Sequence, residues 1–267
     1  MNNIALGRYV PLHSPIHRMD PRAKILALIL VMIAIFIPTG YIGYAIIGVF
    51  VVGTVLAAKL KLNFLWRSLK PMMFMLFFLL IINVFVVKQG TILFEIFQLK
   101  VYSEAIFQTL YIMIRLILMI FLTTILTATT KPLELTLGIE DLLKPFQKLH
   151  VPAHEIAMMI SIALRFIPTL IEETQRIMKA QASRGVDFDN GKFIEKIKAM
   201  LSLIVPLFVS AFQRAEDLAY AMEARGYIPN RPRTRYKQLS MKFTDKMLIL
   251  VAFLLVLCMV ILNVWIL

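Results

Sequence analysis

Residues 25–58 form an unbroken run without a charged side chain, ILALILVMIAIFIPTGYIGYAIIGVFVVGTVLAA. As one helix this run would be about 50 Å long, well beyond the roughly 30 Å hydrocarbon core of a bilayer. A proline and two glycines interrupt it within IPTGYIG, at residues 37–43. The run therefore predicts two short membrane-spanning helices and an integral membrane protein.

The overall composition supports the same class. Of the 267 residues, 60% are hydrophobic, whereas a soluble domain is about half apolar. The formal charge of +13 indicates cytoplasmic loops and membrane lipid with anionic headgroups as a partner. The basic residues lie among acidic ones without a groove-reading motif, which argues against a nucleic-acid partner. The single cysteine, Cys258, allows no disulfide or Cys-ligated zinc site within the chain.

Five membrane spans are predicted along the chain. They cover about Ile25–Ile37, the rest of the run up to Ala58, Pro71–Val87, about Ala105–Thr130 and about Met247–Leu267. Before the first span, MDPRAK (19–24) predicts a turn with Asp20 as N-cap and Pro21 at the first helical position. This span is short, so Arg22 and Lys24 are expected to extend their charges toward the interface. The segment KLKLNFLWRSLK at residues 59–70 is basic and contains no acid. The positive-inside rule then places the N-terminus in the cytoplasm and, after five spans, the C-terminus outside.

Residues 131–246 have a different pattern, with most of the charges of both signs among many apolar residues. Apolar positions recur there at helical spacing on two long segments, one through Ile160 and Ile167 and one through Ile197 and Phe208. Pro168 and Pro206 lie in mid-segment and predict kinks. We therefore expect an all-α membrane protein with an N-terminal membrane domain (1–130), a cytoplasmic or interfacial coupling domain with two long amphipathic helices (131–246) and a C-terminal transmembrane helix (247–267).

The two amphipathic segments end alike, in QASRGVDF (181–188) and MEARGY (222–227). In one interpretation Gly185 and Gly226 are ordinary left-handed helix stops. In the other, Arg184 and Arg225 reach into the acidic grooves of a partner as rigid forks of donors. A diverged repeat is one explanation of the doubling, since Pro168 precedes Gln175-Arg176 by the same interval that separates Pro206 from Gln213-Arg214.

Catalytic and metal chemistry is weakly supported. The segment GVDFDNGKF (185–193) has the wrong glycine spacing for a phosphate loop, and Phe193 stands where such a loop has Ser or Thr. The pairs His13/His17 and His150/His154 have spacings that suit metal ligands, but prolines interrupt both and no further ligand is near. Arg115 lies mid-span and is either a functional residue or a structural one that caps carbonyls or reaches the interface.

Three stretches carry a resemblance to a known family. GRYVPLHSPIHRMDPRAKI (7–25), ALRFIPTLIEETQRIMKAQASRG (163–185) and AYAMEARGY (219–227) resemble the transmembrane T components of energy-coupling factor transporters. The resemblance implies a non-catalytic coupling subunit with no cofactor of its own. It implies that Arg184, Gly185, Arg225 and Gly226 belong to two small-Arg-Gly coupling motifs, with Ala224 as the usual small residue and Ser183 in place of alanine.

The same resemblance implies the partners and the task of the complex. Two ATP-binding-cassette ATPases, which bind ATP and Mg²⁺, would each take one motif. One or more small membrane S components would bind the vitamin or other micronutrient that is imported through the plasma membrane of a prokaryote. A stand-alone secondary transporter is the alternative, although such carriers usually have more spans and more ionisable groups near the midplane. A membrane-embedded enzyme is a third, and lacks a nucleophile–base or metal constellation.

Overall fold

The computed structural model describes residues 9–87, 91–96, 99–145, 152–188, 192–228 and 239–266. Its helices are α1 (Pro21–Phe36), α2 (Gly40–Ala58), α3 (Leu62–Val86), α4 (Ser103–Thr129), α5 (Pro132–Leu143), α6 (Ala153–Ser183), α7 (Phe193–Ala224) and α8 (Phe243–Ile266). The expected all-α membrane class is confirmed. An antiparallel hairpin of β1 (Ile92–Ile96) and β2 (Leu99–Tyr102), which the sequence analysis did not predict, joins α3 to α4.

The chain divides by its internal contacts into two compact units. We call the part up to Leu142 together with the part from Leu239 the membrane unit, and Leu143–Gln238 the crossed-helix unit. The boundary after Leu142 assigns α5 to the membrane unit, whereas the sequence-based boundary at residue 130 assigns it to the coupling domain. The functional division of the chain stays a prediction.

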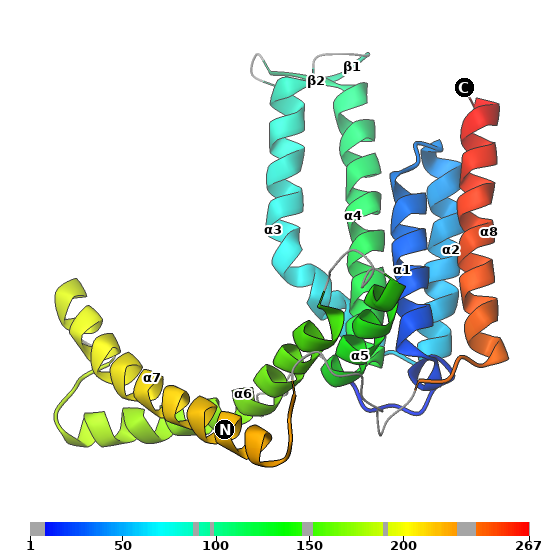
Figure 1. Ribbon diagram of the computed structural model, residues 1–267. Coiled ribbons are helices and arrows are strands. Elements are labelled where there is room, and N and C mark those ends of the chain that lie inside the picture. The colour runs from blue at the N-terminus through cyan, green and yellow to red at the C-terminus, as the bar shows by residue number, and fades with distance from the viewer. Residues whose placement is uncertain are drawn as a thin grey trace. The chain divides into compact units, whose positions relative to one another are not determined.

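Five helices of the membrane unit run alternately up and down, namely α1, α2, α3, α4 and α8 (Figure 1). Helix α1 contacts α2, α4 and α8, and α3 pairs with α4 below the hairpin. The core between α1, α2 and α8 consists of side chains with almost no exposed surface, among them Val31, Ile35, Ile47, Val51 and Met259. Cys258 is a free thiol. The described part of the unit is therefore held together by this packing and not by a disulfide.

By length and composition, five of the described helices could cross a membrane: α2, α3, α4, α6 and α8. This set differs from the predicted one at a single helix, because α6 takes the place of α1. Helix α1 has 16 residues, about 24 Å at 1.5 Å per residue, because Asp20-Pro21 begins it and Pro38 prevents its continuation. The first half of α6 contains only Glu155 and Arg165 as charged residues, which makes it apolar enough to qualify.

Buried polar contacts fix the start of α1. Asp20 is its N-cap, as expected, and its carboxylate accepts a hydrogen bond from the Arg22 backbone N–H at 2.9 Å while Pro21 occupies the first turn. The Arg22 guanidinium pairs with Asp20 at 2.9 Å and with Asp141 of α5 at 3.5 Å. Asp245 in the first turn of α8 accepts from the backbone N–H groups of Asp20 (3.1 Å) and Lys242 (2.7 Å). Helices α1, α5 and α8 are thereby joined at one end of the unit.

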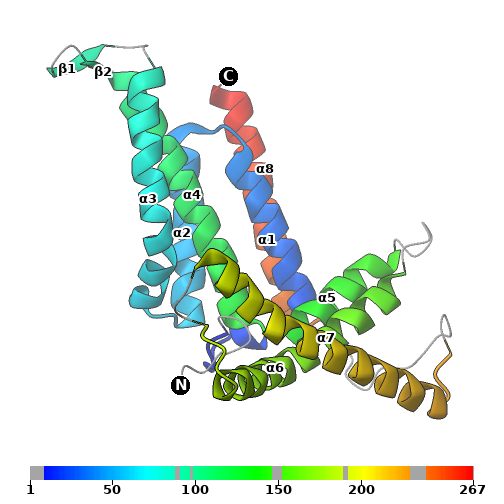
Figure 2. The same cartoon turned by 90° about the vertical axis from the view of Figure 1, so that its left-hand side faces the viewer.

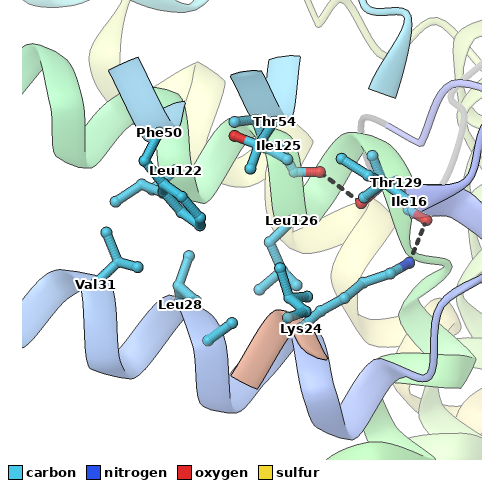
Figure 3. A pocket seen from close by; sticks show the side chains of 12 residues that line it. Ile16, Lys24, Leu28, Val31, Phe50, Thr54, Leu122, Ile125, Leu126 and Thr129 are labelled. Carbon is cyan, nitrogen blue, oxygen red and sulfur yellow. Dashed lines mark hydrogen bonds between the residues drawn. The ribbon is translucent and has the colours of Figure 1, made fainter. Parts of the chain in front are cut away.

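Lys24 is buried inside the membrane unit, where its charge is paired within the chain; its extension toward the interface stays a prediction. Its side chain is buried and crosses the end of a cavity of about 60 Å³ that apolar side chains of α1, α2 and α4 line (Figure 3). The ammonium donates to the Thr129 carbonyl and the Thr130 hydroxyl, both at 3.1 Å. The last carbonyls of α4 have no partner within the helix and lie at the negative end of its dipole, so an inward cation satisfies them.

The beginning of α3 also differs from the prediction. Pro71 does not open this helix but lies inside it, since α3 starts at Leu62 and includes most of the basic segment assigned to a loop. Lys59, with φ 56°, ends α2 in a left-handed conformation and leaves only a tight turn before α3. Helix α3 bends in its N-terminal half (Figure 1), the half that contains Pro71. A proline has no N–H to donate and its ring crowds the preceding turn, which accounts for the bend.

His17 has a structural role, as the sequence analysis favoured. Its Nε2–H donates to the Val10 carbonyl at 3.0 Å, and Nδ1 accepts from the Ser14 hydroxyl at 2.7 Å. Burial lowers the pKa of the His17 imidazole below its usual value, because the charged form loses hydration. Within the described residues, no group of three or more His, Cys, Asp and Glu side chains lies close enough to hold a metal ion.

We predict that Asp245→Ala destabilises the membrane unit. The substitution leaves the buried N–H of Asp20 and the partly exposed N–H of Lys242 without their acceptor, and an unsatisfied buried donor costs about 1–3 kcal/mol. Because water can reach the Lys242 N–H, the expected loss in unfolding free energy is about 1–3 kcal/mol, measured as a lower thermal midpoint of the purified chain in detergent. Asp217→Ala, which removes an exposed carboxylate from α7, is the control; equal midpoints for the two variants would refute the structural role of Asp245.

Candidate functional site: two arginine–glycine helix ends

The two long helices of the crossed-helix unit end one residue before an arginine. Helix α6 ends at Ser183 and α7 at Ala224, and the C-cap residues are Arg184 (φ −89°, ψ 6°) and Arg225 (φ −88°, ψ 10°). The glycines that follow have positive φ, 89° at Gly185 and 72° at Gly226. The expected left-handed stops are thus present at both ends, with nearly the same backbone angles.

The hydrogen bonds of the two ends also match. In α6, Gly185 N–H donates to Ala182 (3.0 Å) and Val186 N–H donates to Gln181 (3.1 Å). In α7, the corresponding bonds run from Gly226 to Glu223 (2.8 Å) and from Tyr227 to Met222 (2.9 Å). This pair of bonds is the Schellman arrangement, which satisfies the last carbonyls and turns the chain sharply away from the axis. The two ends are geometric copies of one another.

Both arginines are exposed at these ends, and neither is in an ion pair within the described residues. A guanidinium held on a fixed helix end can make two parallel hydrogen bonds to a carboxylate, which a flexible lysine does less well. The hydroxyl of Ser183, which stands in place of the usual alanine, donates to the Lys179 carbonyl at 3.1 Å inside its own helix, so only its lone pairs remain for a partner.

Helices α6 and α7 cross each other, and their C-termini lie apart (Figures 1 and 2). The crossing joins the middle of α6 to the C-terminal half of α7, where Glu173 accepts from Arg214 at 2.8 Å. Apolar side chains that include Phe166, Leu170, Leu218 and Met222 line a cavity of about 250 Å³ there. Pro168 and Pro206 both lie inside unbroken helices, so the predicted kinks stay predictions.

The sequence analysis missed the Glu173–Arg214 pair. The suggested repeat aligns Arg214 with Arg176, but Arg176 is exposed whereas Arg214 binds the other helix. On α6 the lining of the crossing comes from Ile162, Phe166 and Leu170, which are not members of the predicted stripe. The spacing from Phe166 and Leu170 to Glu173 is itself helical and was the available signal.

Most of the apolar stripe on α7 faces outward. Its large side chains Ile197, Leu201, Ile204 and Phe208 are 44–61% exposed. Phe208 packs edge to face against Phe212, with ring centroids 4.7 Å apart. On α6, Ile160 and Ile167 are also exposed. An apolar face of this size, left uncovered within the chain, marks a surface for membrane or for another protein.

The other residues that the sequence analysis considered lie outside the described residues or in the membrane unit. Asn190 and Gly191 of the rejected phosphate loop, and His150 of one histidine pair, lie outside the described residues. Arg115 is in α4, where its Nε–H donates to the Tyr44 hydroxyl at 2.7 Å. It therefore caps no carbonyl and is held among aromatic side chains.

Comparisons with known proteins identify the family of the chain. The family model CbiQ, described as a cobalt transport protein, matches residues 13–236. Three curated relatives, each called energy-coupling factor transporter transmembrane protein EcfT, come from Macrococcus caseolyticus, Bacillus subtilis and Listeria innocua. They are 48%, 46% and 44% identical to this chain over 94%, 90% and 94% of its length, and the alignments cover the same shares of the relatives.

The chain belongs to the EcfT family. It is therefore a transmembrane component of an energy-coupling factor transporter, as the resemblance implied, and a multi-pass membrane protein. Membership in such a transporter implies a complex with further subunits, and it is consistent with a non-catalytic role. The region that the CbiQ family model matches contains both crossed helices and both arginine–glycine ends.

We predict that Gly226→Ala weakens the end of α7 through its backbone alone. A Cβ at Gly226 meets no atom within 4 Å, so the cost is that of a left-handed alanine, about 1–2 kcal/mol. Hydrogen exchange at the Gly226 and Tyr227 amides should accelerate, while Gly226→Asn should change it less because asparagine tolerates this conformation. Gly48→Ala, at a helical glycine that also has open space, is the control; unchanged exchange in Gly226→Ala would contradict the cap geometry.

Proposed function

We propose that this chain is the coupling subunit of an energy-coupling factor importer for vitamins or other micronutrients in the plasma membrane of a prokaryote. Two cytoplasmic ABC-type ATPases bind ATP and Mg²⁺, and each receives one arginine–glycine helix end. The crossed helices pass the motion of the ATPases to one or more small membrane S components. The chain itself has no catalytic residue, metal or cofactor in this scheme.

The observation that carries this proposal is the matched pair of helix ends. Unrelated helices often share a positive-φ glycine and these two hydrogen bonds, but the ordinary helix stop does not require a C-cap arginine at both ends. Two equal grooves on a pair of related subunits would require it, since each groove needs the same rigid cation at the same angle. Ser183, Arg184 and Gly185 form one contact, and Ala224, Arg225 and Gly226 form the other.

The uncovered apolar face of α6 and α7 supports the second half of the proposal. Phe208, Phe212 and Val209 are more than half exposed on α7, and Met159 is so on α6. Methionine adapts its shape to different neighbours at little cost, which suits a face that accepts more than one S component. The cytoplasmic location of the N-terminus and of the crossed helices rests on the basic α2–α3 region and the positive-inside rule.

We predict that Arg184→Ala and Arg225→Ala each weaken docking of one ATPase. Truncating one partner of a desolvated charge pair costs about 2–5 kcal/mol, so recovery of the ATPases with the tagged chain should fall in each single variant and most in the double variant. Substrate uptake into proteoliposomes should fall with it. Arg176→Ala, which removes an exposed arginine from the side of α6, is the matched control and should retain both activities.

Normal uptake by the Arg184→Ala/Arg225→Ala double variant would refute the coupling role of the two ends. The same pull-down distinguishes a coupling subunit from a stand-alone secondary transporter. A chain that is recovered without ATPases from intact membranes, and that transports by itself after reconstitution, would be a secondary transporter.

We predict that Phe208→Asp reduces recovery of the small membrane subunits but not of the ATPases. Phe208 is 61% exposed, so the charge should leave the α6–α7 crossing intact while it disfavours an apolar contact. The Glu173→Gln/Arg214→Gln double variant, which removes the ion pair at the crossing, provides a comparison in which helix packing itself is altered. If Phe208→Asp assembles and transports normally, this face is not the docking surface.

A further inference from the structure

Arg115 is a cation inside the membrane unit that the proposed function does not use. It is held where α1, α2 and α4 meet, with its guanidinium carbon 5.6 Å from the centre of the Phe36 ring and 5.2 Å from that of Tyr111. Its Nε–H donates to the Tyr44 hydroxyl at 2.7 Å. These contacts fix the direction of the side chain, but all of them come from uncharged groups.

None of the ion pairs among the described residues includes Arg115. A guanidinium has five N–H donors. Tyr44 accepts from Nε–H and Tyr111 is a second hydrogen-bonding partner, so donors remain for a further ligand. The side chain is also not fully enclosed. A positive charge at membrane depth is costly unless an anion or water reaches it, so the two terminal nitrogens point to a ligand from outside the chain.

The surroundings indicate the depth at which this ligand lies. Phe36 is the last residue of α1, and Tyr44 is in the first turns of α2, so Arg115 lies level with the α1–α2 turn. Tyr41 and Tyr111 stack edge to face beside it, with centroids 5.9 Å apart, and Tyr41 is 44% exposed. Tyrosines gather at the boundary between hydrocarbon and headgroups. Although Arg115 is midway along α4, it lies level with the α1–α2 turn, and the headgroup level at that turn is where its ligand is expected.

We propose that Arg115 binds the phosphate of a membrane phospholipid, in the leaflet that faces the α1–α2 turn. The two terminal nitrogens present a planar fork of donors, a geometry that matches two phosphate oxygens. The tyrosines and Phe36 contact the glycerol and upper acyl region of the same lipid. Under the proposed orientation of the chain, this is the outer leaflet.

A lipid phosphate fits better than a carboxylate of a partner protein for one reason visible in the fold. Of the aromatic side chains around Arg115, Tyr44 is buried, with 3% of its surface exposed, whereas Phe36 is 58% and Tyr41 44% exposed. The guanidinium is therefore bordered by exposed, uncharged rings, which suit the glycerol and upper acyl region of a lipid better than a polar protein surface. A lipid phosphate fits these surroundings, and the bilayer supplies it at high local concentration.

The test compares two lipids that differ in phosphate. The full-length chain, with any subunits that co-purify, is placed in nanodiscs of phosphatidylglycerol or of a monogalactosyl diglyceride with the same acyl chains. We expect a higher thermal midpoint in phosphatidylglycerol for the natural chain. Arg115→Gln should lose this lipid-dependent difference, and Arg115→Lys should retain part of it. Native mass spectrometry should show about tenfold weaker phospholipid retention by Arg115→Gln, as expected for loss of a charge-assisted contact.

The matched control is Arg67→Gln, which removes an exposed arginine from the N-terminal part of α3. It should leave the lipid-dependent difference intact. Three results for the lipid-dependent difference in thermal midpoint overturn the proposal: its persistence in Arg115→Gln, its equal loss in Arg67→Gln, or its absence from the natural chain. So does a result in which Arg115→Gln lowers recovery of a membrane partner without changing the lipid dependence, because the guanidinium would then bind a protein carboxylate. Loss of packing alone lowers the midpoint equally in both lipids and is thereby separated from loss of the ligand.

Discussion

The carboxylate of Asp245 joins two parts of the chain that are 225 positions apart, through its hydrogen bond to the Asp20 backbone. Asp20 in turn caps α1 and pairs with Arg22, which reaches α5. Lys24, one turn further along α1, satisfies the last carbonyls of α4. A buried polar group is stable only when it is fully paired, so these contacts are satisfied together or not at all. They determine which ends of α1, α4, α5 and α8 meet, and hence how the membrane unit closes.

The crossed-helix unit, in contrast to the membrane unit, has very little buried core. Among its described residues only Ala157 and Ala199 are buried apolar side chains, and one ion pair spans the crossing. A pair of helices with so little internal core gains little stability from its own packing. Its apolar surface is instead available to other molecules. Under the proposed function, this region would move one partner in response to another, and a well-packed core would resist that motion.

The arginine–glycine ends reconcile this weak packing with a defined contact. Each Schellman cap fixes the backbone of the arginine with hydrogen bonds inside its own helix. The direction of the guanidinium stem is therefore set locally, before any partner binds, and less conformational entropy is lost on binding. Under the proposed function, a local cap would also survive movement of the helix as a whole, so that the contact with an ATPase could be kept if the crossing of α6 and α7 changed.

The sequence by itself determined the features that depend on local pattern. Hydrophobic runs predicted the membrane class and four of the five helices that are long enough to span, the Asp20-Pro21 pair predicted the start of α1, and two glycines predicted the left-handed stops after Arg184 and Arg225. Only the tertiary structure decided where the charges of α1 go, that Pro71 lies within α3, and that Glu173 pairs with Arg214. Charge next to an apolar run has two solutions, at the interface or in a buried pairing. Which of them is adopted depends on whether a distant helix end, such as that of α4 for Lys24, offers unpaired carbonyls at the same depth.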